Sequence, residues 1–173
     1  MNILSRFKLI TTFVFDIDGV LTDGTLLVLN DGQMARQMNI KDGYALQLAI
    51  RKGYRIAVIS GGNAEILKER LYKLKVTDIF MQVDNKQEVL INYAHRNHLS
   101  WNEILFMGDD IPDYSCMQLA GLACCPADSV KEIKQISTYI STCKGGQGCA
   151  RDVIEKVLKL NGNWELDMNS PAV

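Results

Sequence analysis

Three aspartates stand close together near the start of the chain, at positions 16, 18 and 23 of the stretch FVFDIDGVLTDG. Carboxylates at this spacing repel one another and are costly to remove from water. Their presence directly after an apolar run therefore favours a cation or a reaction that needs them. We take Asp16 and Asp18 as candidate catalytic residues. Asp23 precedes Gly24, which suits a turn into the next segment, so we expect a structural role for Asp23.

Polar side chains also close the later apolar runs. These runs alternate with amphipathic stretches, as in parallel α/β sheets, where ligands bind outside the carboxyl ends of the strands. The further residues expected at this edge are Ser60 after YRIAVI, Lys86 after DIFMQVDN, and Asp109, Asp110 and Asp113 after EILFMG. Carboxylates, a hydroxyl group and an ammonium group at one edge suit phosphoryl transfer through an aspartyl-phosphate with Mg²⁺.

These side chains must be positioned by strands and helices, which the apolar pattern locates. Short apolar runs predict strands at residues 9–16, 54–60, 78–83, 103–108, 121–126 and 137–142. Amphipathic stretches predict helices at residues 42–53, 63–75, 86–98, from 112, near 128–135 and at 150–160. The turn Asn30-Asp31-Gly32 predicts a β-hairpin within residues 25–40. The predicted fold is α/β, a doubly wound, mostly parallel sheet with helices on both faces.

Composition narrows the classes of protein. The chain has 173 residues, 47% of them hydrophobic, and a net charge of −1. This suits one domain, which we place at residues 1–162, followed by a flexible tail at 163–173. No basic stripe supports nucleic-acid binding and no apolar run could span a bilayer, so we expect neither partner. The five cysteines lack CxxC spacing, which indicates reduced thiols in a cytoplasmic protein.

Two stretches and two single residues resemble, in chain order, the four motifs of the haloacid dehalogenase (HAD) superfamily of phosphatases. They are DIDGVLTDG, Ser60, Lys86 and GDDIPD. Three local features match a small branch without a cap domain, which includes 3-deoxy-D-manno-octulosonate 8-phosphate phosphatase and related sugar-acid phosphatases. They are the hairpin soon after the first motif, NIKDGYALQLA and GGQGCARD. The resemblance implies a HAD-like fold with a small hairpin flap at 25–40, no large cap domain, and Mg²⁺-dependent hydrolysis of a sugar-acid phosphate.

The resemblance also implies roles for the first three motifs. Asp16 is the implied nucleophile, because an ionised carboxylate can attack phosphorus without first losing a proton. Asp18 is the implied general acid and base, which protonates the departing sugar oxygen and then takes a proton from the attacking water. Ser60 would donate a hydrogen bond to a phosphoryl oxygen. Lys86 would neutralise phosphate charge and hold the nucleophile.

In the fourth motif, Asp109 is implied to complete the Mg²⁺ site with Asp16 and the main-chain carbonyl of Asp18. Either Asp110 or Asp113 would orient Lys86 or a metal-bound water, and the sequence does not decide between them.

The implied substrate contacts are Gly61, Lys41, Asp42 and Arg151, of which Arg151 is the candidate for an anionic group of the substrate. Many relatives carry a charged residue directly after the glycine of the second motif, whereas here Gly61 is followed by Gly62. This departure leaves the sugar acid open between an octulosonate 8-phosphate and a nonulosonate 9-phosphate. The glycine-rich stretch at 145–148 lacks the Lys-Ser/Thr ending of a phosphate-binding P-loop, so we interpret it as a turn.

The resemblance further implies a homotetramer, in which the hairpin forms the rim of an adjacent subunit's site. Two other hypotheses are weighed against this one. A receiver-like signalling module also combines a doubly wound sheet with an acidic Mg²⁺ site, but its phosphorylated aspartate would follow a middle strand, where this chain has Ser60. A catalytically silent oligomerisation domain is disfavoured because every core catalytic residue is present.

Overall fold

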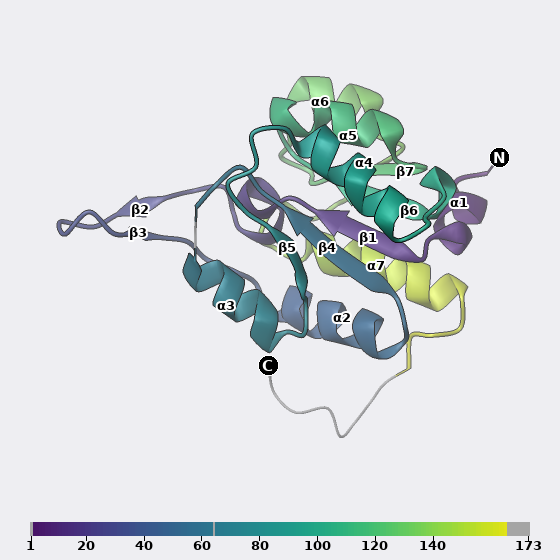
Figure 1. Cartoon of the computed structure of the whole chain (residues 1–173). Helices are drawn as coiled ribbons and strands as arrows, with labels where there is room; N and C mark the ends of the chain where they lie inside the picture. Colours follow the sequence, from purple (N-terminus) through teal and green to yellow (C-terminus); the bar gives the residue numbers. More distant parts are fainter. Residues whose placement is uncertain (1, 64, 166–173) are drawn as a thin grey trace.

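A six-stranded parallel sheet forms the centre of the molecule in the computed structural model, which describes residues 2–63 and 65–165. The order across the sheet is β5-β4-β1-β6-β7-β8 (Figure 1). The strands are β1 (Thr12–Phe15), β4 (Arg55–Ile59), β5 (Asp78–Phe80), β6 (Ile104–Met107), β7 (Leu122–Cys125) and β8 (Tyr139–Ile140). The chain builds outward from β1 first on one side and then on the other. The carboxyl end of β1 is therefore the point where such sheets bind ligands.

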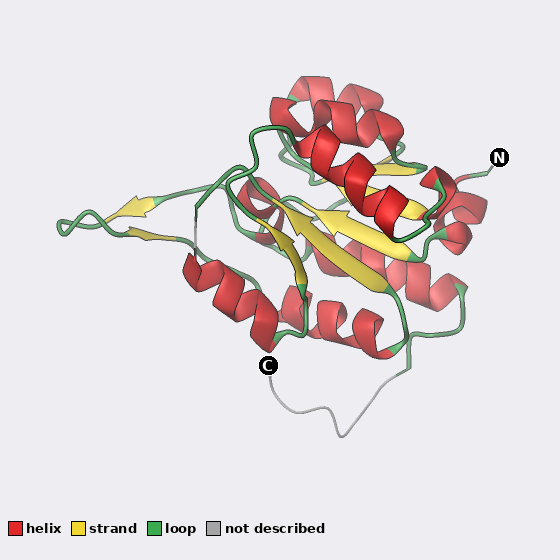
Figure 2. Cartoon of the chain, viewed as in Figure 1, coloured by secondary structure: helices red, strands yellow, loops and turns green. Residues whose placement is uncertain are grey.

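Helices cover both faces of this sheet (Figure 2). Alternate strand residues face opposite layers, so that Phe13 and Phe15 pack into one hydrophobic core and Val14 into the other. One layer holds α1 (Ile3–Leu9), α2 (Ile40–Arg51), α3 (Glu65–Lys73) and α7 (Cys149–Leu160). The other holds α4 (Lys86–Arg96), α5 (Tyr114–Leu119) and α6 (Lys131–Ile136). The predicted doubly wound α/β fold is confirmed.

The hairpin is also present, and it projects away from the rest of the molecule (Figure 1). Its antiparallel strands are β2 (Leu27–Val28) and β3 (Met34–Ala35), much shorter than the predicted segment 25–40. Gly32 in the turn has a φ of 83°, a left-handed value that favours glycine. Among the described residues the chain forms no large cap over the sheet, so this small arm is its only flap.

The structure differs from the predicted elements at the two ends of the chain. Helix α1 was missed, because the apolar residues before β1 read as part of a strand. Asn2 is the N-cap of this helix, and its side chain accepts a hydrogen bond from the backbone N–H of Leu4. Phe7 is buried in the core and anchors the helix there. At the other end, Trp164 packs edge-on against Tyr44. Of the predicted flexible tail, residues 163–165 thus lie against the domain and 166–173 lie outside the described residues.

No helix in the described part of the chain combines the length and apolar character that crossing a bilayer requires. All five cysteines are free thiols, and four of them are buried.

Candidate active site

The polar residues predicted to share one edge follow adjacent strands. Asp16 comes directly after β1, Ser60 after β4 and the Gly108-Asp109 pair after β6, and β1 pairs with both β4 and β6. Asp16 and Ser60 are 7% and 2% exposed. Two polar groups this deeply buried at the ends of core strands need partners, and those partners define the site.

Lys86, the first residue of α4, holds the buried end of the site together. Its Nζ lies 2.9 Å from Asp16 Oδ1 and 2.8 Å from Asp113 Oδ1. Burial alone would lower the pKa of Lys86, but the two carboxylates outweigh it and raise that pKa. The ammonium group therefore stays charged, and it fixes the position of the predicted nucleophile.

The structure distinguishes the roles of Asp113 and Asp110. Asp113 is fully buried, and while one of its oxygens accepts from Lys86, the other accepts a 3.0 Å hydrogen bond from the backbone N–H of Asp109. Asp110 is exposed and accepts from the N–H of Ile111, at the start of a short 3₁₀ turn. Asp113 is thus the residue that orients Lys86 and fixes the loop after β6.

A cation fits beside this cluster. Ligand atoms of Asp16, Asp109 and Asp113 all lie within 4.8 Å of one another. Burial and then the Asp113 carboxylate raise the pKa of Asp16 to about 7, although Lys86 opposes them. Burial and the Asp16 carboxylate likewise raise the pKa of Asp109 to about 7. Three carboxylates facing a single lysine leave negative charge that a divalent cation would neutralise.

Asp109 is the better ligand of the two residues that could join Asp16. Its Oδ1 is buried and has no hydrogen-bond partner among the described residues. Both oxygens of Asp113, in contrast, already accept hydrogen bonds. A buried, unsatisfied carboxylate oxygen in an acidic cluster matches the hard oxygen ligand that Mg²⁺ takes. The participation of the Asp18 carbonyl stays a prediction.

The loop that follows β1 lies tightly against Asp109. Gly19 has a φ of 86°, and a Cβ placed on it would lie 2.0 Å from Asp109 Oδ2, so this position requires glycine. The glycine-rich stretch, interpreted as a turn, packs behind the same loop. A Cβ on Gly145 would lie 2.0 Å from the Gly19 carbonyl oxygen, and Gly146 donates a 2.9 Å backbone hydrogen bond to Val20. This stretch therefore supports the loop after β1 from behind.

Asp18 lies on the outer side of the site and is bound by an arginine that the sequence analysis missed. Arg36, just after β3, donates from Nε to Asp18 Oδ1 at 2.7 Å and from Nη2 to Oδ2 at 3.3 Å. Thr22 Oγ1 lies 3.3 Å from Asp18 Oδ1. One signal was available, since Arg36 is the only cationic residue of the hairpin segment 25–40. Asp23 accepts two hydrogen bonds from Thr25, which confirms its predicted turn role.

Ser60 and the two glycines after it form the wall next to Asp18. The backbone N–H of Gly62 donates to Ser60 Oγ at 3.2 Å. A Cβ on Gly62 would lie 3.2 Å from Asp18 Oδ2 and 3.7 Å from Arg36 Nη2, whereas one on Gly61 would meet only a backbone oxygen at 3.5 Å. Gly62 therefore leaves open space in which Arg36 reaches Asp18.

Two of the other predicted substrate contacts have partners outside the cluster around Asp16. Asp42 is 2% exposed, and its Oδ1 accepts a 2.7 Å hydrogen bond from the backbone of Arg151 at the start of α7. The Arg151 guanidinium pairs with Glu155 and lies over the rings of Tyr44 and Trp164. These contacts join α2 to α7 and orient the Arg151 side chain.

Lys41, the third of these residues, has an exposed side chain. Substrate binding by Lys41, Asp42 and Arg151 stays a prediction.

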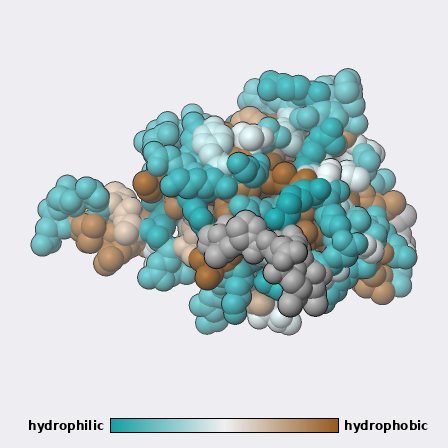
Figure 3. All heavy atoms as spheres, turned by 90° about the horizontal axis from the view of Figure 1, so that it is seen from below, coloured by the Kyte–Doolittle hydropathy of each residue, from teal (hydrophilic) through white to brown (hydrophobic). Residues whose placement is uncertain are grey.

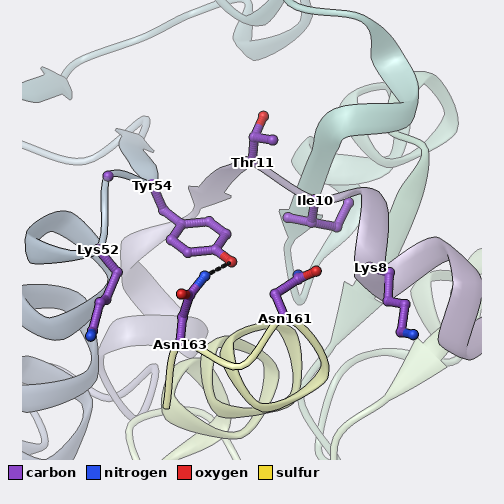
Figure 4. A pocket seen from close by; sticks show the side chains of 8 residues that line it. Lys8, Ile10, Thr11, Lys52, Tyr54, Asn161 and Asn163 are labelled. Atoms are coloured by element: carbon purple, nitrogen blue, oxygen red, sulfur yellow. Dashed lines mark hydrogen bonds between the residues drawn. The ribbon is translucent and has the colours of Figure 1, made fainter. Parts of the chain in front are cut away.

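A hollow of about 390 Å³ lies at the opposite edge of the sheet. It is lined by Thr11 before β1, Tyr54 before β4, and residues that include Lys8, Lys52 and Asn161 (Figure 4). Asn163 donates to the Tyr54 hydroxyl across it at 3.0 Å. Because it borders the amino ends of the strands, this hollow is separate from the carboxyl-end cluster around Asp16.

Comparison with known proteins also points to the haloacid dehalogenase-like hydrolases. The family model of haloacid dehalogenase-like hydrolases matches residues 72–151. Over 164 residues the chain is 26% identical to 3-deoxy-D-manno-octulosonate 8-phosphate phosphatase of Escherichia coli K12, covering 95% of this chain and 87% of that protein.

Solved structures match over nearly the whole fold. A "probable YrbI family phosphatase" from Pseudomonas syringae is 32% identical with a TM-score of 0.90, and the match covers 92% of this chain and 91% of that one. The 3-deoxy-D-manno-octulosonate 8-phosphate phosphatase of Moraxella catarrhalis, solved with a magnesium ion, phosphate and KDO, is 28% identical with a TM-score of 0.89. That match covers 92% of each chain.

Proposed function

We propose that this chain, which belongs to the haloacid dehalogenase-like hydrolase family, is a Mg²⁺-dependent phosphatase that hydrolyses the phosphomonoester of a sugar acid. The observation that carries the proposal is the buried Asp16 carboxylate, held 2.9 Å from Lys86 at the carboxyl end of the central strand. Lys86 holds the nucleophile in place through this ion pair, and Asp109 and Asp113 complete a charged cluster beside it.

In the first half of the reaction, Asp16 attacks the phosphorus of the substrate and forms an aspartyl-phosphate. Lys86 and Ser60 bind phosphoryl oxygens, and Lys86 thereby stabilises charge that develops during the transfer. When bound by Asp16 and Asp109, Mg²⁺ supplies charge neutralisation at the phosphoryl group and keeps both carboxylates ionised.

Asp18 serves the leaving group and then the water. It gives a proton to the departing sugar oxygen, which is a poor leaving group as an alkoxide. It then takes a proton from the water that attacks the phosphorus of the aspartyl-phosphate, and this restores Asp16. Its place on the outer side of the site, with the Asp18 side chain 38% exposed and bound by Arg36 rather than by Lys86, suits a group that must exchange protons with bound molecules.

The substrate class follows the relatives that resemble this chain over most of its length. Two of these are 3-deoxy-D-manno-octulosonate 8-phosphate phosphatases, and the structure of one contains KDO. We therefore propose 3-deoxy-D-manno-octulosonate 8-phosphate, or a related nonulosonate 9-phosphate, as the substrate. Gly62, where many relatives carry a charged side chain, keeps the choice between them open.

We also propose a homotetramer, supported by the apolar surface of the hairpin. Five of its side chains are between 40% and 66% exposed: Leu26, Leu27, Val28, Leu29 and Met34. Figure 3 shows hydrophobic surface on this projecting arm. Such a patch on a short two-stranded arm is typical of an interface between subunits. The free cysteines suit the reducing conditions of a cytoplasmic location.

Turnover of a panel of phosphate esters by the purified protein with Mg²⁺ tests the proposal. The panel should contain octulosonate and nonulosonate phosphates, hexose phosphates, nucleoside monophosphates and p-nitrophenyl phosphate. We expect the highest kcat/KM for a sugar-acid phosphate, because binding of its remote groups orients the ester. A higher kcat/KM for a neutral sugar or a nucleotide would contradict the proposed substrate class, and no turnover of any ester would contradict the phosphatase itself.

A further inference from the structure

Arg36 makes an unusual contact for a residue on a projecting hairpin. Its guanidinium donates from two nitrogens to the two oxygens of Asp18, and its side chain is only 10% exposed, against 38% for Asp18. An arginine that grips a carboxylate with two nitrogens is held more firmly than a surface ion pair. The hairpin thus inserts a cation next to the predicted general acid.

This cation lies on the side of the site where the leaving group must bind. Asp18 can protonate the departing oxygen only from hydrogen-bonding distance, so the sugar has to lie beside Asp18. Arg36 Nε is 2.7 Å from Asp18, which places the guanidinium within reach of the same sugar. Ser60, the proposed phosphoryl contact, borders the same space, because a Cβ on Gly62 would lie 3.5 Å from Ser60 Oγ and 3.2 Å from Asp18 Oδ2.

The pair must also rearrange during the reaction. Both Asp18 oxygens accept hydrogen bonds from Arg36, and Oδ1 also contacts Thr22 Oγ1 at 3.3 Å. A guanidinium has donors only, so Asp18 has to give up at least one of these contacts before it faces the ester oxygen. Gly62 provides room for that movement, because it has no side chain where a Cβ would lie 3.7 Å from Arg36 Nη2.

We propose that Arg36 is a specificity-determining residue that exchanges Asp18 for the carboxylate of the substrate. This inference rests on the proposed function. The resting structure already shows the guanidinium binding one carboxylate in this position, and a sugar acid supplies a second with the same geometry. Substrates with a carboxylate then free Asp18 to approach the ester oxygen, whereas substrates without one leave it bound to Arg36.

The test compares two substrates that differ in one group. One is the sugar-acid phosphate that the wild type turns over best, and the other is the same compound with its carboxylate reduced to a hydroxymethyl group. We expect Arg36→Ala to lower kcat/KM on the acid by at least ~10-fold, which is ~1.4 kcal/mol of transition-state binding. On the alcohol the change should stay within ~2-fold, because no carboxylate is lost there.

Two further variants make the result specific. Arg36→Lys keeps the charge but loses the planar fork, so it should recover part of the preference for the acid. Gln37→Ala, a truncation at the next, exposed residue of the same arm, should leave the preference unchanged. The thermal midpoint of each variant shows whether the arm still folds onto the domain.

The outcomes separate the inference from the proposed function. An acid preference in the wild type that falls selectively in Arg36→Ala supports both. Equal losses on the two substrates would show that Arg36 only anchors the hairpin, and no loss on either would remove it from the reaction. Both results overturn the inference while leaving the proposed function in place. A wild type that does not prefer the acid would overturn both.

Discussion

Two groups of charged residues at this site differ in the elements that hold them and in their exposure to water. Lys86, Asp16 and Asp113 are at most 10% exposed in their side chains, and they lie at the start of α4, directly after β1 and in the 3₁₀ turn that follows β6. Arg36 and Asp18 join a projecting hairpin to a loop, and the Asp18 side chain is 38% exposed. Groups that must keep one geometry through the reaction are thus built into the sheet, while groups that must move lie where a short arm meets solvent.

The energetic consequences differ in the same way. Burying the charges of Asp16 and Lys86 costs several kcal/mol that their attraction only partly recovers, so the cluster serves chemistry rather than stability. The pair of Asp18 and Arg36 is open to water on the Asp18 side, so that water or a second carboxylate can replace its hydrogen bonds when it breaks. Variants on each side should therefore fail in different ways.

The largest effect is expected at the nucleophile. Asp16→Asn should abolish turnover, because an amide cannot attack phosphorus, whereas Asp18→Asn should slow turnover by ~10²-fold or more. Both are measured as kcat on the best substrate, with the thermal midpoint as a check on folding. Near-normal kcat in Asp16→Asn would break the distinction between the two groups and rule out the covalent mechanism.

Removal of the metal should act on the buried cluster alone. Activity should disappear in EDTA, return with Mg²⁺, and fall in excess Ca²⁺, which prefers a looser coordination shell. In the metal-free protein the pKa values of Asp16 and Asp109 are raised to about 7. Protons then compete with the metal below that pH at both carboxylates, and each contributes about a factor of ten, so Mg²⁺ should bind on the order of 100-fold more weakly at pH 6 than at pH 8.

Titrations of the metal-free protein with Mg²⁺ at the two pH values provide this measurement. The same affinity at both would contradict a site built from the two perturbed carboxylates, and full activity in chelator would remove Asp109 from its proposed role.

The substitution Asp113→Ala tests how much the buried cluster contributes to the stability of the protein. It leaves Lys86 buried with one partner fewer and frees the N–H of Asp109, so the free energy of unfolding should fall by ~3–5 kcal/mol. Asp110→Asn, which keeps an oxygen able to accept from Ile111, should change it by less than ~0.5 kcal/mol. Urea denaturation of both variants measures the difference. Equal, small losses in the free energy of unfolding would mean that the buried cluster around Lys86 contributes no more to stability than the exposed hydrogen bond of Asp110.

The smallest effect is expected at Asp42, a buried carboxylate outside the cluster around Lys86. Burial raises the pKa of Asp42 to about 6, despite its hydrogen bond from Arg151. The folded protein then holds this proton more tightly than the unfolded chain. Asp42 therefore reduces stability progressively as the pH rises from about 4 to about 6, by on the order of 3 kcal/mol.

Asp42→Asn cannot lose that proton. The stability of this variant relative to the wild type should therefore rise across the same pH interval and become constant above it, as measured by denaturation at several pH values. A difference that does not change with pH would show that Asp42 is already ionised in the folded protein near pH 4.

The fold and half of the site could be predicted from sequence because they depend on which residues follow one another along the chain. Apolar runs located the strands, and the polar residues at their ends, Asp16, Ser60 and Lys86, lie where the rule for parallel sheets places them. The choice between Asp110 and Asp113 depends on which side chain a 3₁₀ turn buries, and neighbouring aspartates do not reveal that. Arg36 reaches Asp18 only through the direction of the hairpin, which is set by tertiary contacts.

The central claim is that Asp16 carries the phosphoryl group during turnover. Asp18→Asn removes the base that activates water for the second step, whereas p-nitrophenolate can leave without a proton in the first, so this variant should accumulate the aspartyl-phosphate when mixed with p-nitrophenyl phosphate and Mg²⁺. Borohydride reduces an aspartyl-phosphate to homoserine, which peptide mass spectrometry can locate in the sequence. We expect homoserine at position 16 and none in the Asp16→Asn, Asp18→Asn double variant. Turnover without modification of position 16, or homoserine at position 109 instead, would contradict the mechanism.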